Sequence, residues 1–287
     1  MSISLKNVTY TYMPKTPFEK TAIDTINLEI QRGEFVAIIG HTGSGKSTLV
    51  QHLNGILKPT QGTVTVDGVD LHDKKAAAKA ARSKVGMVFQ YPEHQLFEET
   101  IYADIAFGPK NLGLTEDEID QRVKRAMNFV GLDFDQYAQR SPFQLSGGQM
   151  RRVAIAGVIA LEPEYLILDE PSAGLDPRGR DEIFQEIVQL YQSSGITVIL
   201  VSHNMEDVAK MATRLIVMNG GKVSLDGSPL EVFREPEKLK AAGVDVPPVT
   251  ALLRLLKLRG LPIDDSLLTI DEAVATITTA LGERKEC

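Results

Sequence analysis

The fold is decided by Gly40-His41-Thr42-Gly43-Ser44-Gly45-Lys46-Ser47, which fits the pattern G-x-x-x-x-G-K-[ST] of a phosphate-binding loop. By average residue frequencies, this pattern arises by chance in roughly 1 chain in 100 of this length. Further along the chain lies Leu145-Ser146-Gly147-Gly148-Gln149. Its chance occurrence is rarer still, on the order of 1 chain in 1,000 or less. The two stretches in this order predict a nucleotide-binding protein.

The glycines of the loop allow backbone N–H groups to converge on phosphate oxygens, and a helix beginning near Gly45 would direct its positive end at them. Lys46 would reach the β- and γ-phosphates of a nucleotide, and Ser47 would hold Mg²⁺. A chance glycine turn is the alternative, but the strand before the loop and the helix after it oppose that interpretation. The predicted nucleotide-binding residues of this segment are Gly40, His41, Thr42, Gly43, Ser44, Gly45, Lys46, Ser47 and Thr48.

The composition limits the class of protein. Of 287 residues, 43% are hydrophobic and 24% are charged, which is ordinary for a globular protein. The formal net charge of −7 argues against a dedicated nucleic-acid binder, so no nucleic acid is expected as a partner. The single cysteine, Cys287, cannot form an internal disulfide, which fits a reducing compartment. We find no secretory signal and no run of about 18 apolar residues that would predict a membrane span.

Short apolar runs end in residues suited to chemistry. Continuous runs of this length favour strands that are buried on both faces, as in a parallel sheet. In open α/β sheets, ligands bind at the carboxyl ends of such strands, so we expect the residues after the runs to meet at one edge. The runs are Val36–Ile39 before Gly40, Val85–Phe89 before Gln90, Leu166–Leu168 before Asp169-Glu170, and Thr197–Val201 before Ser202-His203.

Other patterns suggest how the rest of the chain is organised. Short strands at residues 3–10 and 63–66, with turn signals between them, predict an antiparallel β-subdomain in the N-terminal third. The capping box Thr115-x-x-Glu118 opens a predicted helix, and residues 181–191 predict another. We therefore expect an α/β main domain over residues 1–235, with a helical subdomain at about 91–160. Prolines around residues 228–246 mark the boundary to a small helical extension, residues 236–287, which must pack on the main domain or on another subunit.

The segment Leu145–Gln149 resembles the signature motif of the ATP-binding-cassette (ABC) ATPases, and Leu166–Glu170 resembles their Walker B segment. This resemblance implies the P-loop NTPase fold of an ABC ATPase, with a parallel-sheet core. It also implies that Asp169 binds Mg²⁺, directly or through water, and that Glu170 acts as the general base. His203 resembles the family's switch histidine, and Gln90 resembles the Q-loop glutamine that senses Mg²⁺ and water. Taken alone, an acidic pair at a strand end, a histidine or a glutamine is more often structural.

The signature implies a second subunit. Ser146 and the N–H groups of Gly147 and Gly148 precede a helix that carries Arg151 and Arg152, which makes another helix N-terminus suited to an anion. One phosphate cannot easily take two such helix ends from one chain. In ABC ATPases the signature of one subunit caps the nucleotide of the other, so the resemblance implies a head-to-tail dimer with two ATPs between the subunits. The further nucleotide contacts implied in this way are Ser146, Gly147, Gly148, Gln149 and Asp176.

An aromatic residue is expected against the adenine ring. Tyr12 falls where the family places that residue. Tyr10 is a competing candidate, and either tyrosine could instead be a core residue of a strand.

Within the family, several segments look like the ATPases of energy-coupling-factor (ECF) importers of vitamins and metal ions. These segments are Phe89–Phe97, Asp104–Pro109, Gln149–Gly157, which is similar to the second (A-prime) ATPase, and Leu268–Ala273. The resemblance implies a paralogous ATPase, a transmembrane coupling subunit and small substrate-binding membrane subunits as partners. It also implies a peripheral location at the cytoplasmic face of the cell membrane.

Segment 91–108, with Leu96, Phe97 and Phe107, would line the groove that receives the coupling subunit, unless these are core residues of the helical subdomain. Two alternatives to an ECF importer ATPase remain. One is an ordinary ABC importer ATPase that works as a homodimer. The other is a soluble ABC ATPase that assists assembly, like those of iron–sulfur biogenesis.

Overall fold

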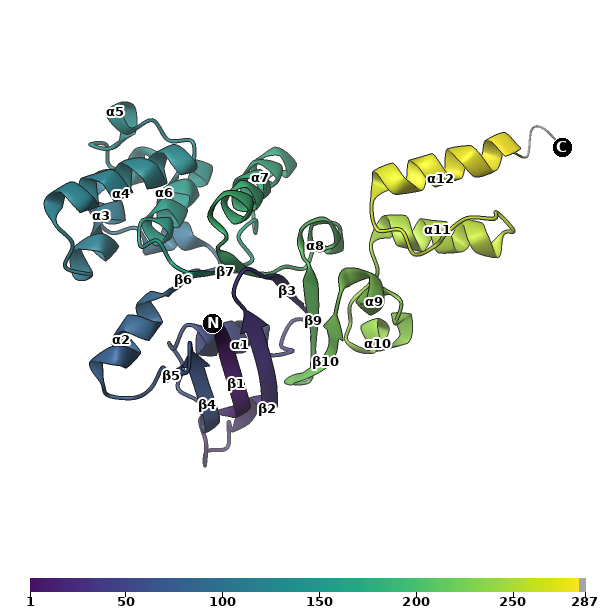
Figure 1. Ribbon diagram of the computed structural model, residues 1–287, viewed down its shortest axis with the longest axis horizontal. Helices are drawn as coiled ribbons and strands as arrows, with labels where there is room; N and C mark the ends of the chain where they lie inside the picture. Colours follow the sequence, from purple (N-terminus) through teal and green to yellow (C-terminus); the bar gives the residue numbers. More distant parts are fainter. Residues whose placement is uncertain (284–287) are drawn as a thin grey trace.

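The structure is a computed structural model that describes residues 1–283, and Cys287 lies outside the described residues. Its centre is a sheet with the strand order β10-β9-β3-β8-β7-β6 (Figure 1). Strands β9, β3, β8, β7 and β6 run parallel, and β10 is antiparallel to β9. The strands are β3 (Phe35–Ile39), β6 (Val85–Val88), β7 (Tyr165–Asp169), β8 (Thr197–Val201), β9 (Arg214–Asn219) and β10 (Lys222–Gly227). This arrangement confirms the predicted parallel core.

A second, antiparallel sheet lies beside the first and has the order β2-β1-β4-β5. It confirms the predicted N-terminal β-subdomain. Its strands are β1 (Ser2–Tyr12), β2 (Lys20–Gln31), β4 (Gln61–Val66) and β5 (Val69–Asp70). Strand β2 was not predicted from the sequence, although Ile26, Leu28 and Ile30 alternate with polar residues in it and are buried.

The central sheet is buried on both faces because its strands present apolar side chains to two separate cores. In β3, Val36 and Ile38 belong to the core shared with the antiparallel sheet and with α1 (Lys46–Leu53). Phe35, Ala37 and Ile39 belong to the core on the opposite face, which the other helices cover. Successive strand residues point to opposite faces, so an uninterrupted apolar run can serve both cores.

The helical subdomain covers that opposite face near β6 (Figure 1). The predicted capping box is present at α4, where Thr115 and Glu118 hold each other's backbone N–H groups. The subdomain contains η1 (Pro92–Gln95), α3 (Ile101–Asn111), α4 (Glu116–Phe129), α5 (Phe134–Tyr137), η2 (Pro142–Gln144) and α6 (Gly147–Ile159). Outside it lie α2 (Ala76–Ser83), α7 (Pro177–Ser194) and α8 (Met205–Met211).

The C-terminal part has two packing environments. Helices α9 (Pro229–Phe233) and α10 (Pro236–Ala241) pack into the main core through Phe233 and Leu239. Helices α11 (Pro248–Leu258) and α12 (Ile270–Glu283) form a hairpin around their own small core, and Figure 1 shows it projecting from the main domain. The domain division at residue 235 stays a prediction. Helix α10, which lies beyond that residue, packs with the main domain. Among residues 1–283, no helix is long and apolar enough to cross a membrane.

Candidate nucleotide-binding and catalytic site

The phosphate-binding loop connects β3 to α1, and two of its glycines are required by close backbone approach. Gly40 has φ +149°, and a Cβ there would lie 2.3 Å from the carbonyl oxygen of Met218. Gly45 has φ +105°, and its Cβ would lie 2.6 Å from the carbonyl oxygen of Ala22. Gly45 is also the N-cap of α1, and no side chain of the described residues caps this helix. The first N–H groups of α1 therefore remain available to an anion.

Lys46 lies inside the loop and is 5% exposed. Its Nζ donates hydrogen bonds to the carbonyl oxygens of Gly40 (2.8 Å) and His41 (3.1 Å). Burial lowers the pKa of Lys46, and the carboxylates of Glu170 and Asp169 oppose that shift. A buried cation held by backbone carbonyls at an open helix end fits the phosphate groups of a nucleotide.

Asp169, at the end of β7, is paired with Ser47 of the phosphate-binding loop. Asp169 is 7% exposed, and burial raises the pKa of its carboxyl group, while a hydrogen bond from the Ser47 hydroxyl lowers it. The hydroxyl of Ser44 is buried in the same loop and has no hydrogen-bond partner among the described residues. One carboxylate and one hydroxyl are the protein ligands that Mg²⁺ takes when phosphates and water complete its coordination. Asp169 and Ser47 therefore fit that ion.

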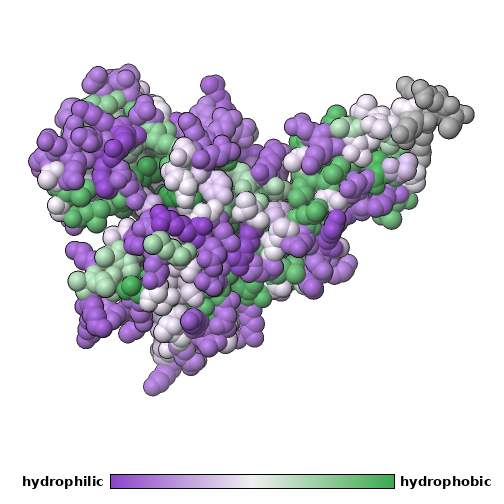
Figure 2. Space-filling model, viewed as in Figure 1, coloured by the Kyte–Doolittle hydropathy of each residue, from purple (hydrophilic) through white to green (hydrophobic). Residues whose placement is uncertain are grey.

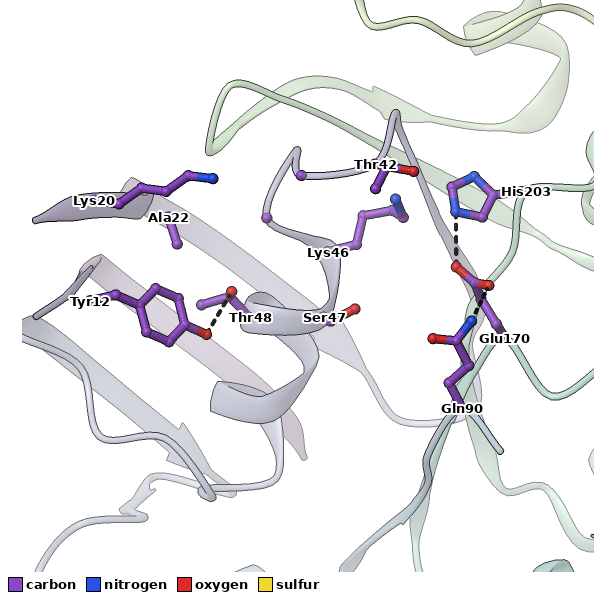
Figure 3. Close-up of a pocket in the computed structure, with 12 residues that line it drawn as sticks. Tyr12, Lys20, Ala22, Thr42, Lys46, Ser47, Thr48, Gln90, Glu170 and His203 are labelled. Atoms are coloured by element: carbon purple, nitrogen blue, oxygen red, sulfur yellow. Dashed lines mark hydrogen bonds and ion pairs between the residues drawn. The ribbon is translucent and has the colours of Figure 1, made fainter. Parts of the chain in front are cut away.

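Gln90 and His203 both contact the carboxylate of Glu170, and the three residues come from different strand ends (Figure 3). Glu170 Oε1 lies 2.8 Å from His203 Nε2, and Glu170 Oε2 accepts a hydrogen bond of 3.0 Å from Gln90 Nε2. Gln90 follows β6, Glu170 follows β7 and His203 follows β8, so the parallel sheet brings them to one edge as expected. Glu170 has φ 51°, in the left-handed region that a glutamate adopts only at an energetic cost.

These groups share one cavity of about 500 Å³ (Figure 3). Tyr12 lines its other end, where its hydroxyl lies 3.2 Å from the Thr48 hydroxyl. Tyr10 does not line the cavity and packs edge-on against Tyr12, with ring centroids 4.8 Å apart. The cavity is lined by Tyr12, Lys20, Ala22, Thr42, Gly43, Gly45, Lys46, Ser47, Thr48, Gln90, Glu170 and His203. Lys20 and Ala22 were not predicted as site residues, because they lie on β2, which was not predicted either.

The signature residues lie elsewhere. Within residues 1–283, none of the segment Ser146–Gln149 lines the cavity. Ser146 is the exposed N-cap of α6, where its hydroxyl accepts a hydrogen bond from the Gln149 backbone N–H (3.3 Å) and the Gln149 side chain accepts one from the Ser146 N–H (3.1 Å). Asp176, the N-cap of α7, also lies outside the cavity lining. The fold therefore brings the loop, Asp169, Gln90, Glu170 and His203 together and keeps the signature apart.

Two cations near the signature are already used inside the chain, which corrects their expected part in anion binding. Arg151 is 2% exposed and pairs through two nitrogens with Glu93, at 3.0 and 3.1 Å. It also donates hydrogen bonds to the carbonyl oxygens of Pro171 and Ala173. Arg152 pairs with two carboxylates of α7. Among residues 1–283, the N-terminal N–H groups of α6 and the Ser146 hydroxyl are the groups left to meet an anion there.

The fold and the site are those of a P-loop ATPase of the cassette class. The family described as ABC transporter matches residues 23–173. A relative from Clostridium tetani, "Energy-coupling factor transporter ATP-binding protein EcfA2", is 60% identical over 273 residues, which cover 95% of each chain. A relative of the same name from Clostridium acetobutylicum is 55% identical and covers 99% of this chain and 100% of its own.

Solved structures agree with these relatives. One is cbiO1 from Clostridium perfringens, described as part of the ABC transporter complex cbiONQ (TM-score 0.72, 39% identity, 90% of this chain and 95% of that chain). Another is the cassette MJ0796 as a dimer bound to ADP and Pi (TM-score 0.70, 31% identity, 79% of this chain and 98% of that chain). The chain belongs to the ABC transporter family and, within it, to the ATP-binding proteins of energy-coupling factor transporters. It is an ATP-hydrolysing transporter subunit.

Proposed function

We propose that this chain hydrolyses ATP as one half of a cassette dimer that drives an ECF importer through a membrane-embedded partner. The observation that carries this proposal is the division of the site. The cavity gathers Lys46, Gln90, Glu170 and His203, whereas Ser146 lies outside it as the exposed N-cap of α6. A second subunit that presents its own signature would complete the ring of donors around the transferred phosphate.

Each residue of the cavity has a chemical task in this proposal. Glu170 accepts the proton of the attacking water, and His203 and Gln90, which contact its two carboxylate oxygens, orient that carboxylate and the water. Lys46 releases the loop carbonyls and places its charge on the β- and γ-phosphates. Ser47, Gln90 and Asp169 would hold Mg²⁺, which when bound neutralises charge on the same phosphates.

The remaining nucleotide contacts follow the shape of the cavity. Tyr12, 38% exposed, offers its ring to adenine at the end of the cavity away from Glu170. The loop N–H groups hold the phosphates. In the assembled dimer, Ser146, Gly147, Gly148, Gln149 and Asp176 of each subunit face the nucleotide of the other.

The proposed second ATPase subunit is a paralogue, so the dimer is a heterodimer. The hairpin of α11 and α12 offers a further contact for it, because Leu255 and Val274 are 56% and 57% exposed and Figure 2 shows apolar surface along the hairpin. A homodimer would need the same two composite sites. Isolation of the complex distinguishes the two arrangements.

The proposed contact with the transmembrane coupling subunit lies on the helical subdomain. Phe97 and Phe107 are 58% and 45% exposed, and their rings pack edge-on with centroids 4.9 Å apart. They line a groove of about 190 Å³ together with Leu96, which is mostly buried and belongs to the main core. A helix of the coupling subunit that inserts an apolar side chain there would hold this chain at the cytoplasmic face of the membrane as a peripheral protein. The vitamin or metal ion is then chosen by the small membrane subunits.

The test is mass spectrometry of all proteins that co-purify with this chain from gently solubilised membranes of its native host. We expect a second cassette ATPase, a multi-helix coupling protein and small substrate-binding membrane proteins. A homodimer with a conventional permease pair would contradict the ECF assembly, and recovery of soluble partners alone would contradict a role in transport. The double variant Phe97→Ala/Phe107→Ala tests the groove separately. It should lose the membrane proteins and keep the second ATPase.

A further inference from the structure

The C-terminal turn of α10 touches the phosphate-binding loop directly. The backbone N–H of His41 donates a hydrogen bond of 3.2 Å to the carbonyl oxygen of Ala242. Ala242 is fully buried, and the side chain of Asn219, at the end of β9, donates to the neighbouring carbonyl of Ala241 at 3.3 Å. One loop amide that could otherwise turn toward a phosphate is thus committed to a residue 201 positions further along the chain.

The next residue, Gly243, lies so close to His41 of the loop that a side chain on it would crowd His41. Gly243 has φ +64° and ends α10, with its N–H bonded to the carbonyl of Lys240. A Cβ on Gly243 would lie 3.0 Å from the Cβ of His41, so the loop would have to move by a few tenths of an ångström to admit it. A side chain at position 243 would therefore press directly on His41 of the loop.

The turn is itself connected to the C-terminal hairpin. Leu239 and Val244 anchor α10 in the main core, beside Phe233 of α9. Arg254 of α11 donates a hydrogen bond of 2.7 Å to the carbonyl oxygen of Phe233. A continuous series of packed and hydrogen-bonded groups thus runs from the hairpin through α9 and α10 to His41.

We propose that Ala242 and Gly243 are positioning residues for the phosphate-binding loop, and that they link its geometry to the C-terminal hairpin. The turn holds the loop in the shape that directs its remaining N–H groups at the phosphates. Loops of this kind bind by several short, directional contacts, so a small displacement weakens all of them together. The inference rests on the proposed role of the loop in binding ATP and adds to it a support from outside the loop.

The test compares Gly243→Ala with Gly195→Ala in the full-length chain. Gly195 ends α7 with φ +65°, so both substitutions carry the same backbone cost, but a Cβ on Gly195 meets nothing within 4 Å. We measure the dissociation constants of ADP and of a non-hydrolysable ATP analogue by calorimetry, together with the unfolding temperature. Gly243→Ala should weaken nucleotide binding about 5- to 20-fold, which corresponds to about 1–2 kcal/mol. Gly195→Ala should lower the unfolding temperature to a similar extent without changing affinity.

A compensating variant separates positioning from general damage. His41→Gly removes the side chain that the new Cβ would meet, so Gly243→Ala should cost less affinity in that background than in the wild type. Equal losses of affinity in Gly243→Ala and Gly195→Ala, or a loss that His41→Gly leaves unchanged, would overturn the proposal. Lys46→Ala tests the loop independently, because normal nucleotide binding by that variant would contradict the proposed function itself.

The link to the hairpin has its own variant. Arg254→Met keeps an unbranched apolar stem and removes the guanidinium with its hydrogen bond to Phe233. Arg259→Met, at the exposed end of the same helix, is the control. In the purified complex, Arg254→Met should weaken nucleotide binding about 2- to 5-fold, which corresponds to less than about 1 kcal/mol. Unchanged affinity in Arg254→Met would overturn the link between the hairpin and the loop.

Discussion

At the scale of single residues, the candidate base can be tested against a glutamate in the same backbone conformation. Glu170→Gln should bind ATP normally and lower kcat by about 10²- to 10⁴-fold, because the amide cannot accept the proton of the attacking water. Glu162→Gln is the control, since Glu162 also has a left-handed φ (53°) but lies outside the cavity. The measurement is steady-state ATPase activity of the assembled complex. Full turnover by Glu170→Gln would refute the assignment of Glu170.

A buried histidine predicts how stability depends on pH. His52 is fully buried, its Nδ1 lies 2.7 Å from the carbonyl oxygen of Thr48, and burial lowers its pKa. The unfolded chain, in which the histidine keeps its ordinary pKa, therefore binds the proton first as the pH falls below about 6.5. This contribution to stability is present above that pH and is lost on acidification, at no more than about 1.4 kcal/mol per pH unit. Burial lowers the pKa of His72 in the same sense.

Chemical denaturation between pH 7.5 and 5.5 measures this effect. As the pH is lowered, the free energy of unfolding should fall less steeply in His52→Gln than in the wild type. His94→Gln, which replaces an exposed histidine, should keep the wild-type slope. The same slope in His52→Gln and the wild type would show that His52 takes up its proton without unfolding.

At the scale of secondary-structure elements, two capping boxes in the helical subdomain separate folding from function. Thr115 caps α4 and Ser146 caps α6 with the same reciprocal pattern. Replacing either by alanine should cost about 1 kcal/mol of stability. Only Ser146→Ala should also lower the ATPase rate of the complex, because only that hydroxyl is proposed to face a nucleotide. Equal ATPase rates in the two variants at matched stability would contradict the role of Ser146.

The sequence predicted the elements whose residues contact two cores or carry a recognisable cap. Strands β3, β7 and β8 appear as apolar runs because each is buried on both faces, and α4 begins at its capping box as predicted. Strand β2 was missed because one of its faces meets solvent and its apolar residues are interrupted by Thr25, which has a left-handed φ. Helices α9 and α10 were read as a boundary because prolines begin both of them, although proline is compatible with the first turn of a helix.

The candidate site could be predicted where its residues are local in sequence. The loop is contiguous, and the strand ends place Gln90, Glu170 and His203 at one edge of the sheet. The burial of Arg151 could not be predicted, because its partner Glu93 and the carbonyl groups of Pro171 and Ala173 come from distant segments. Local patterns carry no information about such long-range pairs.

At the scale of the whole molecule, the separation of cavity and signature predicts that bound nucleotide strengthens the association of the two ATPase subunits. Glu170→Gln should form a stable dimer with its partner ATPase when ATP and Mg²⁺ are present, because each ATP then joins two subunits and is not hydrolysed. Lys46→Ala should gain no such strengthening under the same conditions. Light scattering coupled to size-exclusion chromatography measures both. A dimer of unchanged strength without ATP would show that other surfaces, such as the hairpin, dominate the assembly.

The backbone of Glu170 holds the candidate base in an energetically unfavourable conformation. A left-handed glutamate costs roughly 1–2 kcal/mol relative to a residue that adopts this conformation freely. Glu170→Gly should therefore be inactive yet unfold at an equal or higher temperature than the wild type, as calorimetry of the isolated chain can establish. A clear loss of stability would show that the contacts of Glu170 with Gln90 and His203 outweigh the backbone cost. If the prediction holds, selection at this position has favoured catalysis over stability. Substitutions that restore folding to destabilised variants should then include some that abolish ATP hydrolysis.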